Sequence, residues 1–232
     1  MGLGVRLLNN SGKTDFRSKT SILFDLDGTL TDPGIGITRS VNYALESFGI
    51  HTEDLNELCK FIGPPLKESF MIYYGFTEKQ ALAAVEKYRE YFREKGIYEN
   101  EMMEGIDVLL RRLADDGRQL IVATSKPKVF ADIILEHFDI MKYFSLVCGS
   151  ELDGTRVNKD EVIRYAIDKA GIQDLSSAVM VGDREHDVIG AGKVGMDCIG
   201  CLFGYGTRDE LQAAGAALIV GTVEELGTVL LG

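Results

Sequence analysis

The sequence predicts an α/β protein, a doubly wound parallel sheet with an all-helical domain inserted after the first strand. Short apolar runs alternate with helical stretches along most of the chain, which is typical of parallel strands joined by helices. This alternation is interrupted once, from about residue 34 to residue 98, where the pattern is helical throughout. The expected strands lie near residues 21–26, 118–124, 144–148, 177–182, 197–202 and 216–220.

These elements divide the chain into three parts. Residues 1–19 contain no continuous apolar block of signal-peptide length, so we expect a flexible leader and no secretion. Residues 20–33 and 99–232 form the expected core domain, and residues 34–98 form the helical insertion. The chain has 232 residues, 45% of them hydrophobic, which is enough for a full core and a second small domain.

Composition excludes several classes of function. The formal net charge of -11 argues against binding to nucleic acid or to an anionic membrane surface. No apolar run approaches the roughly 18 residues of a membrane-spanning helix, so we expect a cytoplasmic protein. We expect it to be a monomer or a homodimer. Cys198 and Cys201 have the spacing of a redox or zinc motif, but no second pair accompanies them, and we interpret them as core thiols.

The first strand ends in two carboxylates. Asp25 and Asp27 are two residues apart, so on an extended backbone they project to the same face. Gly28 permits a sharp turn and brings backbone N–H groups close to a ligand. The two carboxylates repel each other, and a bound cation would relieve that repulsion. A strand followed by an ordinary Asp-Gly turn is the simpler alternative.

Three later segments offer partners for this pair. Thr124 and Ser125 end an apolar run, where hydroxyl and N–H groups can hold a phosphoryl oxygen or simply cap a helix. Lys159 lies in the first turn of an amphipathic helix, where a cation opposes the helix dipole, although a surface lysine needs no explanation. Asp183 ends another apolar strand, and Asp187 follows one helical turn later, so both can face one ligand.

In this order and at these spacings, the four segments resemble the four motifs of haloacid dehalogenase superfamily hydrolases, and the phosphoglycolate phosphatase-like subgroup best. The resemblance extends from about Thr20 to Gly232. It implies a Rossmann-like core with residues 34–98 as a helical cap domain that closes over the site. It also implies that Asp25 is the nucleophile that forms an aspartyl-phosphate and that Asp27 is the general acid/base.

The resemblance assigns the other residues as well. Lys159 and the groups at Gly28, Thr124 and Ser125 would hold the phosphoryl oxygens. Asp183 would bind the metal ion together with Asp25 and the backbone carbonyl of Asp27, and Asp187 would support these ligands. In many relatives a Thr or Ser follows the Gly-Asp pair, whereas Arg184 stands there in this chain, and the roles of Arg184 and of the neighbouring His186 stay open.

The charges of the motif residues favour magnesium. Four aspartates and a dianionic phosphate are opposed by Lys159 alone, so a divalent cation is needed, and ligands that are all oxygen favour Mg²⁺ over zinc. We therefore expect a Mg²⁺-dependent phosphatase acting on a small phosphomonoester, with phosphoglycolate as the leading substrate. The alternatives are a 5'-nucleotidase or another metabolite phosphatase, a phosphomutase, and a non-catalytic binding protein.

Substrate choice is expected to lie in the helical insertion. The turn Ile62-Gly63-Pro64-Pro65 joins two of its helices, and Lys67 follows on the second helix. Gly63 and Lys67 are our candidates for substrate specificity, because a rigid turn with a nearby cation could meet an anionic substrate. A plain helix–helix turn is the alternative interpretation.

Overall fold

The computed structural model describes residues 15–232, which lie in two compact units. Within the described residues, one unit runs up to Leu30 and continues over Met102–Gly232, and the other comprises Thr31–Glu101. The sequence predicts the insertion over residues 34–98, three residues shorter at each end. We refer to the first unit as the core unit and to the second as the helical unit.

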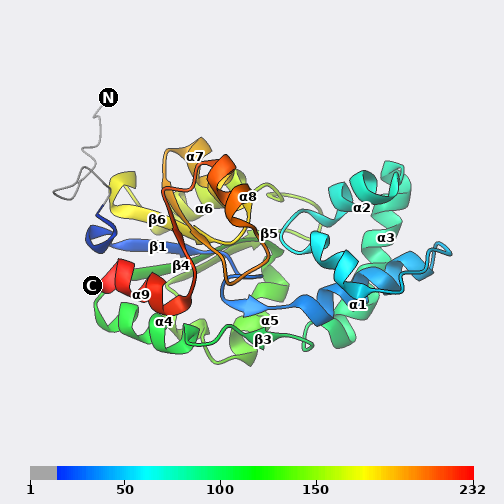
Figure 1. The fold of residues 1–232 in the computed structure, drawn as a ribbon, viewed down its shortest axis with the longest axis horizontal. Coiled ribbons are helices and arrows are strands. Elements are labelled where there is room, and N and C mark those ends of the chain that lie inside the picture. Colours follow the sequence, from blue (N-terminus) through cyan, green and yellow to red (C-terminus); the bar gives the residue numbers. More distant parts are fainter. Residues whose placement is uncertain (1–14) are drawn as a thin grey trace. The chain divides into compact units, whose positions relative to one another are not determined.

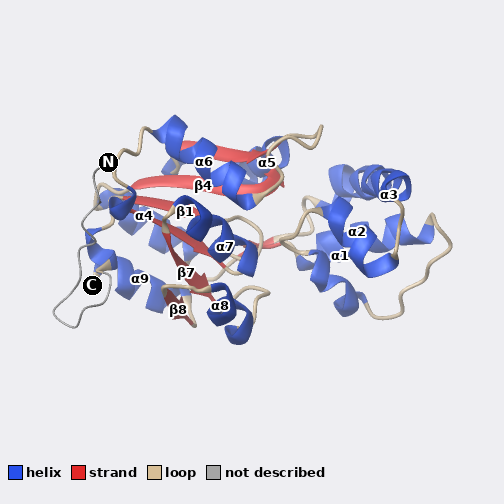
Figure 2. Cartoon of the chain, turned by 90° about the horizontal axis from the view of Figure 1, so that it is seen from above, coloured by secondary structure: helices blue, strands red, loops and turns tan. Residues whose placement is uncertain are grey.

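The core unit contains a parallel sheet of six strands, as the sequence predicts. The strands follow the order β5-β4-β1-β6-β7-β8 (Figures 1 and 2). Their bounds are β1 Ser21–Phe24, β4 Gln119–Pro127, β5 Leu146–Ser150, β6 Ala178–Gly182, β7 Asp197–Cys201 and β8 Leu218–Val220. The doubly wound fold class is thereby confirmed. The strand order reverses at the neighbours β1 and β6, which is where such sheets bind ligands.

Helices cover both faces of this sheet. On one side lie α6, α7 and α8, and on the other α4, α5 and α9 (Figure 1). The bounds are α4 Ile106–Asp115, α5 Lys128–His137, α6 Lys159–Ala170, α7 Glu185–Val194, α8 Arg208–Ala214 and α9 Val223–Leu231. Buried side chains of α6 and α7, such as Val162 and Val188, pack against Leu23 and Met180 of the sheet. Burying this apolar surface fixes the strand ends that carry the motif residues.

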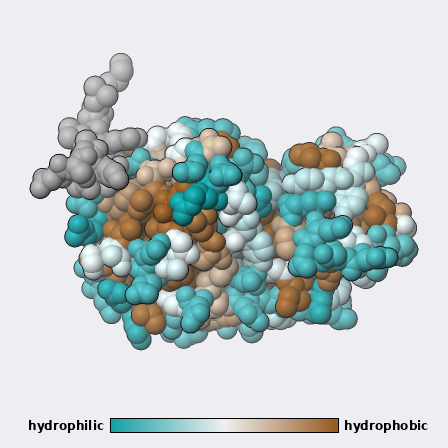
Figure 3. All heavy atoms as spheres, in the orientation of Figure 1, coloured by the Kyte–Doolittle hydropathy of each residue, from teal (hydrophilic) through white to brown (hydrophobic). Residues whose placement is uncertain are grey.

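The helical unit is built from α1 Gly34–Glu46, α2 Leu66–Tyr74 and α3 Glu78–Tyr91, with a 3-10 segment at Leu55–Phe61 and a π-helical turn at Phe92–Gly96. Helices α1 and α3 pack together through buried residues that include Val41, Leu45, Ala81 and Val85. Hydrophilic residues cover much of the visible face of this unit, with separate hydrophobic patches (Figure 3). None of the helices within residues 15–232 is long and apolar enough to cross a membrane.

The structure differs from the sequence prediction in three places. Residues 1–14 of the expected leader lie outside the described residues, but residues 15–19 pack on the core unit: Phe16 is buried, and Lys19 Nζ donates to Ser176 O at 2.8 Å. Strand β4 continues to Pro127 after a register shift, because Pro127 pairs with Ser150. The two-stranded sheet of β2 Thr31–Asp32 and β3 Glu101–Met102 is too short to produce a readable alternation.

Candidate active site

The first motif lies at the carboxyl end of β1. The backbone N–H of Asp25 donates to Val181 O of β6 at 2.9 Å, which holds Asp25 beside the end of β6. The Asp25 side chain is 4% exposed. Gly28 has a φ of +83°, which an L residue adopts only with strain, so the chain can reverse here.

Lys159 joins three of the elements at this end of the sheet. Its Nζ lies 2.7 Å from Asp25 Oδ1 and 2.8 Å from Asp187 Oδ1, and it donates to Ala123 O of β4 at 3.2 Å. The side chains of Lys159, Asp25 and Asp187 are all buried. Lys159 is the first residue of α6 and so lies in the first turn of a helix, as the sequence predicts. The unfavourable interaction of its charge with the helix dipole is offset by the two carboxylates that it contacts.

Asp183 follows β6 and is fully buried. Its Oδ1 accepts a hydrogen bond from Thr29 Oγ1 at 3.2 Å, and its Oδ2 accepts one from the backbone N–H of Tyr205 at 2.7 Å. A Cβ on Gly28 would lie 2.3 Å from Asp183 Oδ2, so only glycine fits there. The carboxylates of Asp25, Asp183 and Asp187 each place an oxygen within 4.8 Å of the others.

Burial and mutual repulsion oppose full ionisation of this cluster. Burial and the charges of Asp187 and Asp25 raise the pKa of Asp183 well above its ordinary value. Burial raises the pKa of Asp187 to about 6, against the opposing influence of Lys159. Burial lowers the pKa of Lys159, but Asp187 and Asp25 outweigh it, and the net shift is upward. A divalent cation would relieve the repulsion, and the all-oxygen donor set fits Mg²⁺.

Comparison with known proteins agrees with this geometry. The family model for haloacid dehalogenase-like hydrolases matches residues 22–201. The chain belongs to this family.

The relatives of this hydrolase include a nucleotidase, a predicted phosphatase and a protein kinase by name. It is 52% identical over 193 residues to a 5'-nucleotidase of Pseudomonas aeruginosa, covering 83% of this chain and 87% of the relative. It is 51% identical to the crystal structure of a predicted phosphatase from Clostridium acetobutylicum, with a TM-score of 0.89 over 90% of this chain and 97% of that one. It is 35% identical to the tyrosine-protein kinase PtkA of Mycobacterium tuberculosis, covering 90% of this chain and 72% of the relative. The chain is a phosphoric monoester hydrolase of this family.

Besides Lys159, this end of the sheet holds another buried lysine, Lys126, which the sequence alone does not assign. Lys126 Nζ contacts both carboxylate oxygens of Asp27, at 2.8 and 2.7 Å. Burial raises the pKa of Asp27, while the charge and hydrogen bonds of Lys126 oppose that shift. A signal was present in the sequence: Lys126 lies two residues after Thr124 on an extended strand, so both face the same side.

The second motif lies within the last residues of β4. Thr124 is buried, and its Oγ1 accepts a hydrogen bond from the backbone N–H of Lys126 at 3.2 Å. The carbonyl of Ser125 accepts one from Ser150 Oγ at 2.8 Å. Ala123, next to Thr124, supplies the carbonyl that Lys159 contacts, so this strand end belongs to the same cluster.

The two specificity candidates belong to the helical unit. Gly63 has a φ of +100°, and Lys67 lies in the first turn of α2, where its Nζ is 3.1 Å from Glu78 Oε1 of α3. Both partners of this pair are exposed, so the pair adds little to stability. Both residues are therefore described within the helical unit only.

Arg184 and His186, to which the sequence assigns no role, have different surroundings. Arg184 precedes α7, and its Nε lies 2.8 Å from Glu210 Oε1 of α8. Its backbone N–H donates to Asp187 Oδ2 at 3.1 Å, which fixes the Asp187 carboxylate. Burial lowers the pKa of His186, the second residue of α7. Arg184 therefore links the last motif to α8 through its side chain and holds Asp187 through its backbone N–H.

Proposed function

We propose that this hydrolase is a Mg²⁺-dependent phosphatase that cleaves a small phosphomonoester through an aspartyl-phosphate on Asp25. The observation that carries the proposal is the buried Asp25 carboxylate, which has the Lys159 ammonium group at 2.7 Å and the Asp183 and Asp187 carboxylates beside it. A nucleophile, a cation for the transferring oxygens and an oxygen-rich metal site thus lie at one end of the sheet.

Two displacements at phosphorus complete the reaction. A carboxylate oxygen of Asp25 attacks the phosphorus, the bond to the leaving oxygen breaks, and Asp27 gives that oxygen a proton. Water then attacks the phosphorus of the aspartyl-phosphate while Asp27 accepts its proton, which releases inorganic phosphate and restores Asp25.

The remaining motif residues stabilise charge. Lys159 and the groups at Gly28, Thr124 and Ser125 hold the phosphoryl oxygens. Asp25, Asp183 and the backbone carbonyl of Asp27 would hold Mg²⁺, with Asp187 in support. When bound, the ion supplies positive charge against the phosphoryl oxygens. The four carboxylates exceed Lys126 and Lys159 by two negative charges when all are ionised, which a divalent ion would balance.

For the substrate we propose a nucleoside 5'-monophosphate. From the sequence alone, phosphoglycolate is the leading substrate and nucleotides are an alternative. The relatives favour the reverse order, because the 5'-nucleotidase is 52% identical, whereas a phosphoglycolate phosphatase of Agrobacterium fabrum is 27% identical. The helical unit would make this choice, since the motif residues for phosphoryl transfer lie in the core unit.

A phosphate-release assay tests the proposal. The protein with Mg²⁺ is given nucleoside 5'-monophosphates, phosphoglycolate, sugar phosphates and an aryl phosphate, together with the variants Asp25→Asn and Asp174→Asn. Asp174 caps a 3-10 turn before β6, at the opposite end of that strand, so its variant is the matched control. We expect nucleotides to have the highest kcat/KM, Asp25→Asn to release no phosphate, and Asp174→Asn to match wild type.

Other outcomes separate the alternatives. A higher kcat/KM for phosphoglycolate than for every nucleotide would reject the nucleotide proposal and keep the phosphatase. Activation by a bisphosphorylated sugar, with the phosphoryl group returned to a sugar, would indicate a phosphomutase. No phosphate release from any compound would favour a binding protein.

A further inference from the structure

The loop at residues 202–207, between β7 and α8, packs against Asp183 more closely than side chains would allow. A Cβ on Gly206 would lie 1.8 Å from Asp183 O. A Cβ on Gly204 would lie 2.4 Å from Asp183 Oδ2 and 2.3 Å from Gly28 O. Glycine at both positions therefore lets this loop, which carries none of the four motifs, reach the Asp183 carboxylate.

This close approach fixes the orientation of the carboxylate. Between the two glycines, the backbone N–H of Tyr205 donates to Asp183 Oδ2 at 2.7 Å. From the other side, Thr29 Oγ1 donates to Asp183 Oδ1 at 3.2 Å. Each oxygen thus has a hydrogen-bond donor and still keeps a lone pair, so these two contacts fix the orientation of the Asp183 carboxylate.

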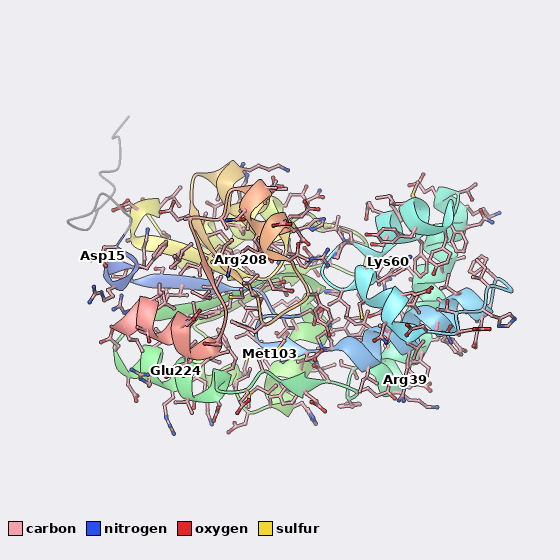
Figure 4. The ribbon with its side chains drawn as sticks, viewed as in Figure 1. Asp15, Arg39, Lys60, Met103, Arg208 and Glu224 are labelled. Atoms are coloured by element: carbon pink, nitrogen blue, oxygen red, sulfur yellow. The ribbon has the colours of Figure 1, made fainter. Side chains whose placement is uncertain are left out.

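The loop is itself anchored by an ion pair at the start of α8. Glu210 Oε1 accepts hydrogen bonds from Arg184 Nε at 2.8 Å and from the backbone N–H of Glu185 at 2.9 Å. The Arg184 and Glu210 side chains are 13% and 20% exposed, so water screens this pair less than a surface pair. Figure 4 labels Arg208, the first residue of α8, two positions before Glu210.

We infer that residues 204–206, anchored by the Arg184–Glu210 pair, are a positioning loop that orients Asp183 and thereby sets the affinity of the protein for its divalent cation. Arg184 and Glu210 are positioning residues in this arrangement and do not touch the reacting atoms. The inference rests on the proposed function, which places Mg²⁺ on Asp183. It gives Arg184 a role that the sequence alone does not indicate.

Removing a direct hydrogen-bond partner of a metal ligand typically weakens metal binding about 10- to 100-fold, and Arg184 and Glu210 act one contact further out, so the lower end of that range applies. The test is calorimetric titration of the metal-free protein with Mg²⁺, without substrate, for wild type, Glu210→Ala, Glu210→Gln and Arg184→Met. We expect Glu210→Ala and Arg184→Met to raise the Kd for Mg²⁺ about tenfold or more. Glu210→Gln keeps an acceptor oxygen and should recover most of the affinity. With saturating Mg²⁺, kcat should stay within about threefold of wild type, because the reacting groups are intact.

Glu225→Ala is a matched control. Glu225 occupies the same place in α9 as Glu210 does in α8, the third residue after a capping threonine, and its Oε2 accepts the Gly221 N–H at 2.6 Å. We expect its Kd for Mg²⁺ to equal that of wild type.

The outcomes distinguish this inference from the proposed function. Absence of Mg²⁺ binding by wild type would overturn the metal role and the inference together. Normal binding by wild type with an unchanged Kd in Glu210→Ala and Arg184→Met would overturn the inference alone, as would an equal loss in Glu225→Ala. Should Glu210→Ala not fold, Arg184→Met removes the same ion pair from the other side and decides the matter.

Discussion

Replacing Lys126 by methionine removes the ammonium group that contacts both oxygens of Asp27, at 2.8 and 2.7 Å. The Asp27 side chain is only 11% exposed, so water replaces the lost contacts poorly. We expect Lys126→Met to lower the free energy of unfolding by about 4 kcal/mol at pH 7.

Two independent estimates give this magnitude. Removing one partner of a buried ion pair typically costs about 3–5 kcal/mol. Asp27 can limit that cost by taking up a proton, and protonating a carboxyl with an ordinary pKa of about 3.9 at pH 7 costs roughly 4 kcal/mol. Because protonation sets the upper limit, the deficit should shrink by about 1.4 kcal/mol for each pH unit below 7, until the pH reaches the raised pKa of Asp27 in folded wild type.

The sign of the pH dependence follows from the direction of the pKa shift. Burial raises the pKa of Asp27, and without Lys126 the opposing influence is gone, so the pKa rises further. The folded variant then keeps a proton that the unfolded chain releases above about pH 4. Stability of Lys126→Met relative to wild type therefore falls as the pH rises above the folded pKa of Asp27 in wild type, which already lies above its ordinary value.

Urea unfolding at several pH values measures the free energy of unfolding of wild type and Lys126→Met. Far-ultraviolet circular dichroism follows it, since the chain has no tryptophan to serve as a fluorescent probe. Chelator is present throughout, so that metal binding does not contribute. The variant Asp27→Asn with Lys126→Met is the control, because it removes both charges and should recover part of the loss. A deficit under about 1 kcal/mol that does not change with pH would refute the reasoning.

Three further predictions concern the metal, the helical unit and the thiols. Chelation should stop phosphate release, and Mg²⁺ should restore it better than Ca²⁺, whose larger and more variable shell misplaces the nucleophile; full activity in excess chelator would contradict the metal role. Lys67→Ala should change the ranking of substrates by one or two powers of ten, of order 1–3 kcal/mol, with slow hydrolysis of an aryl phosphate unchanged; a uniform loss for all substrates would reject a role in specificity alone. Cys59 should react with a thiol reagent before the buried Cys148, whose pKa burial raises to about 11; peptide mapping that finds Cys148 labelled first would contradict the structure.

The sheet and most of the motif residues could be predicted from the sequence because local patterns determine them. The alternation of apolar runs and helical stretches gives the strand positions, and two aspartates at one strand end share a face whatever surrounds them. The parallel topology then brings Asp25, Lys159, Asp183 and Asp187 to one end of the sheet. Nothing in this reasoning requires knowledge of distant contacts.

The remaining features depend on such contacts. Lys126 looks like a strand-end lysine until Asp27, 99 residues away, is placed beside it. Residues 15–19 contain a single large apolar side chain, so their pattern does not predict a packed segment. In the structure Phe16 is nevertheless buried, and Lys19 Nζ lies 3.5 Å from Asp197 Oδ2. Gly204 and Gly206 read as ordinary loop glycines, because only the fold shows that Asp183 lies against them.

Trapping the covalent intermediate tests the central claim most directly. The protein is mixed with Mg²⁺ and a nucleoside 5'-monophosphate and quenched with borohydride, which reduces an acyl phosphate to an alcohol. Peptide mass spectrometry then reads residues 21–32, which contain Asp25, Asp27 and Asp32. We predict homoserine at position 25 and unmodified aspartate at positions 27 and 32, with no reduction in Asp25→Asn. Phosphate release by wild type with homoserine at position 27, or at none of the three positions, would contradict the assignment of Asp25 as the nucleophile.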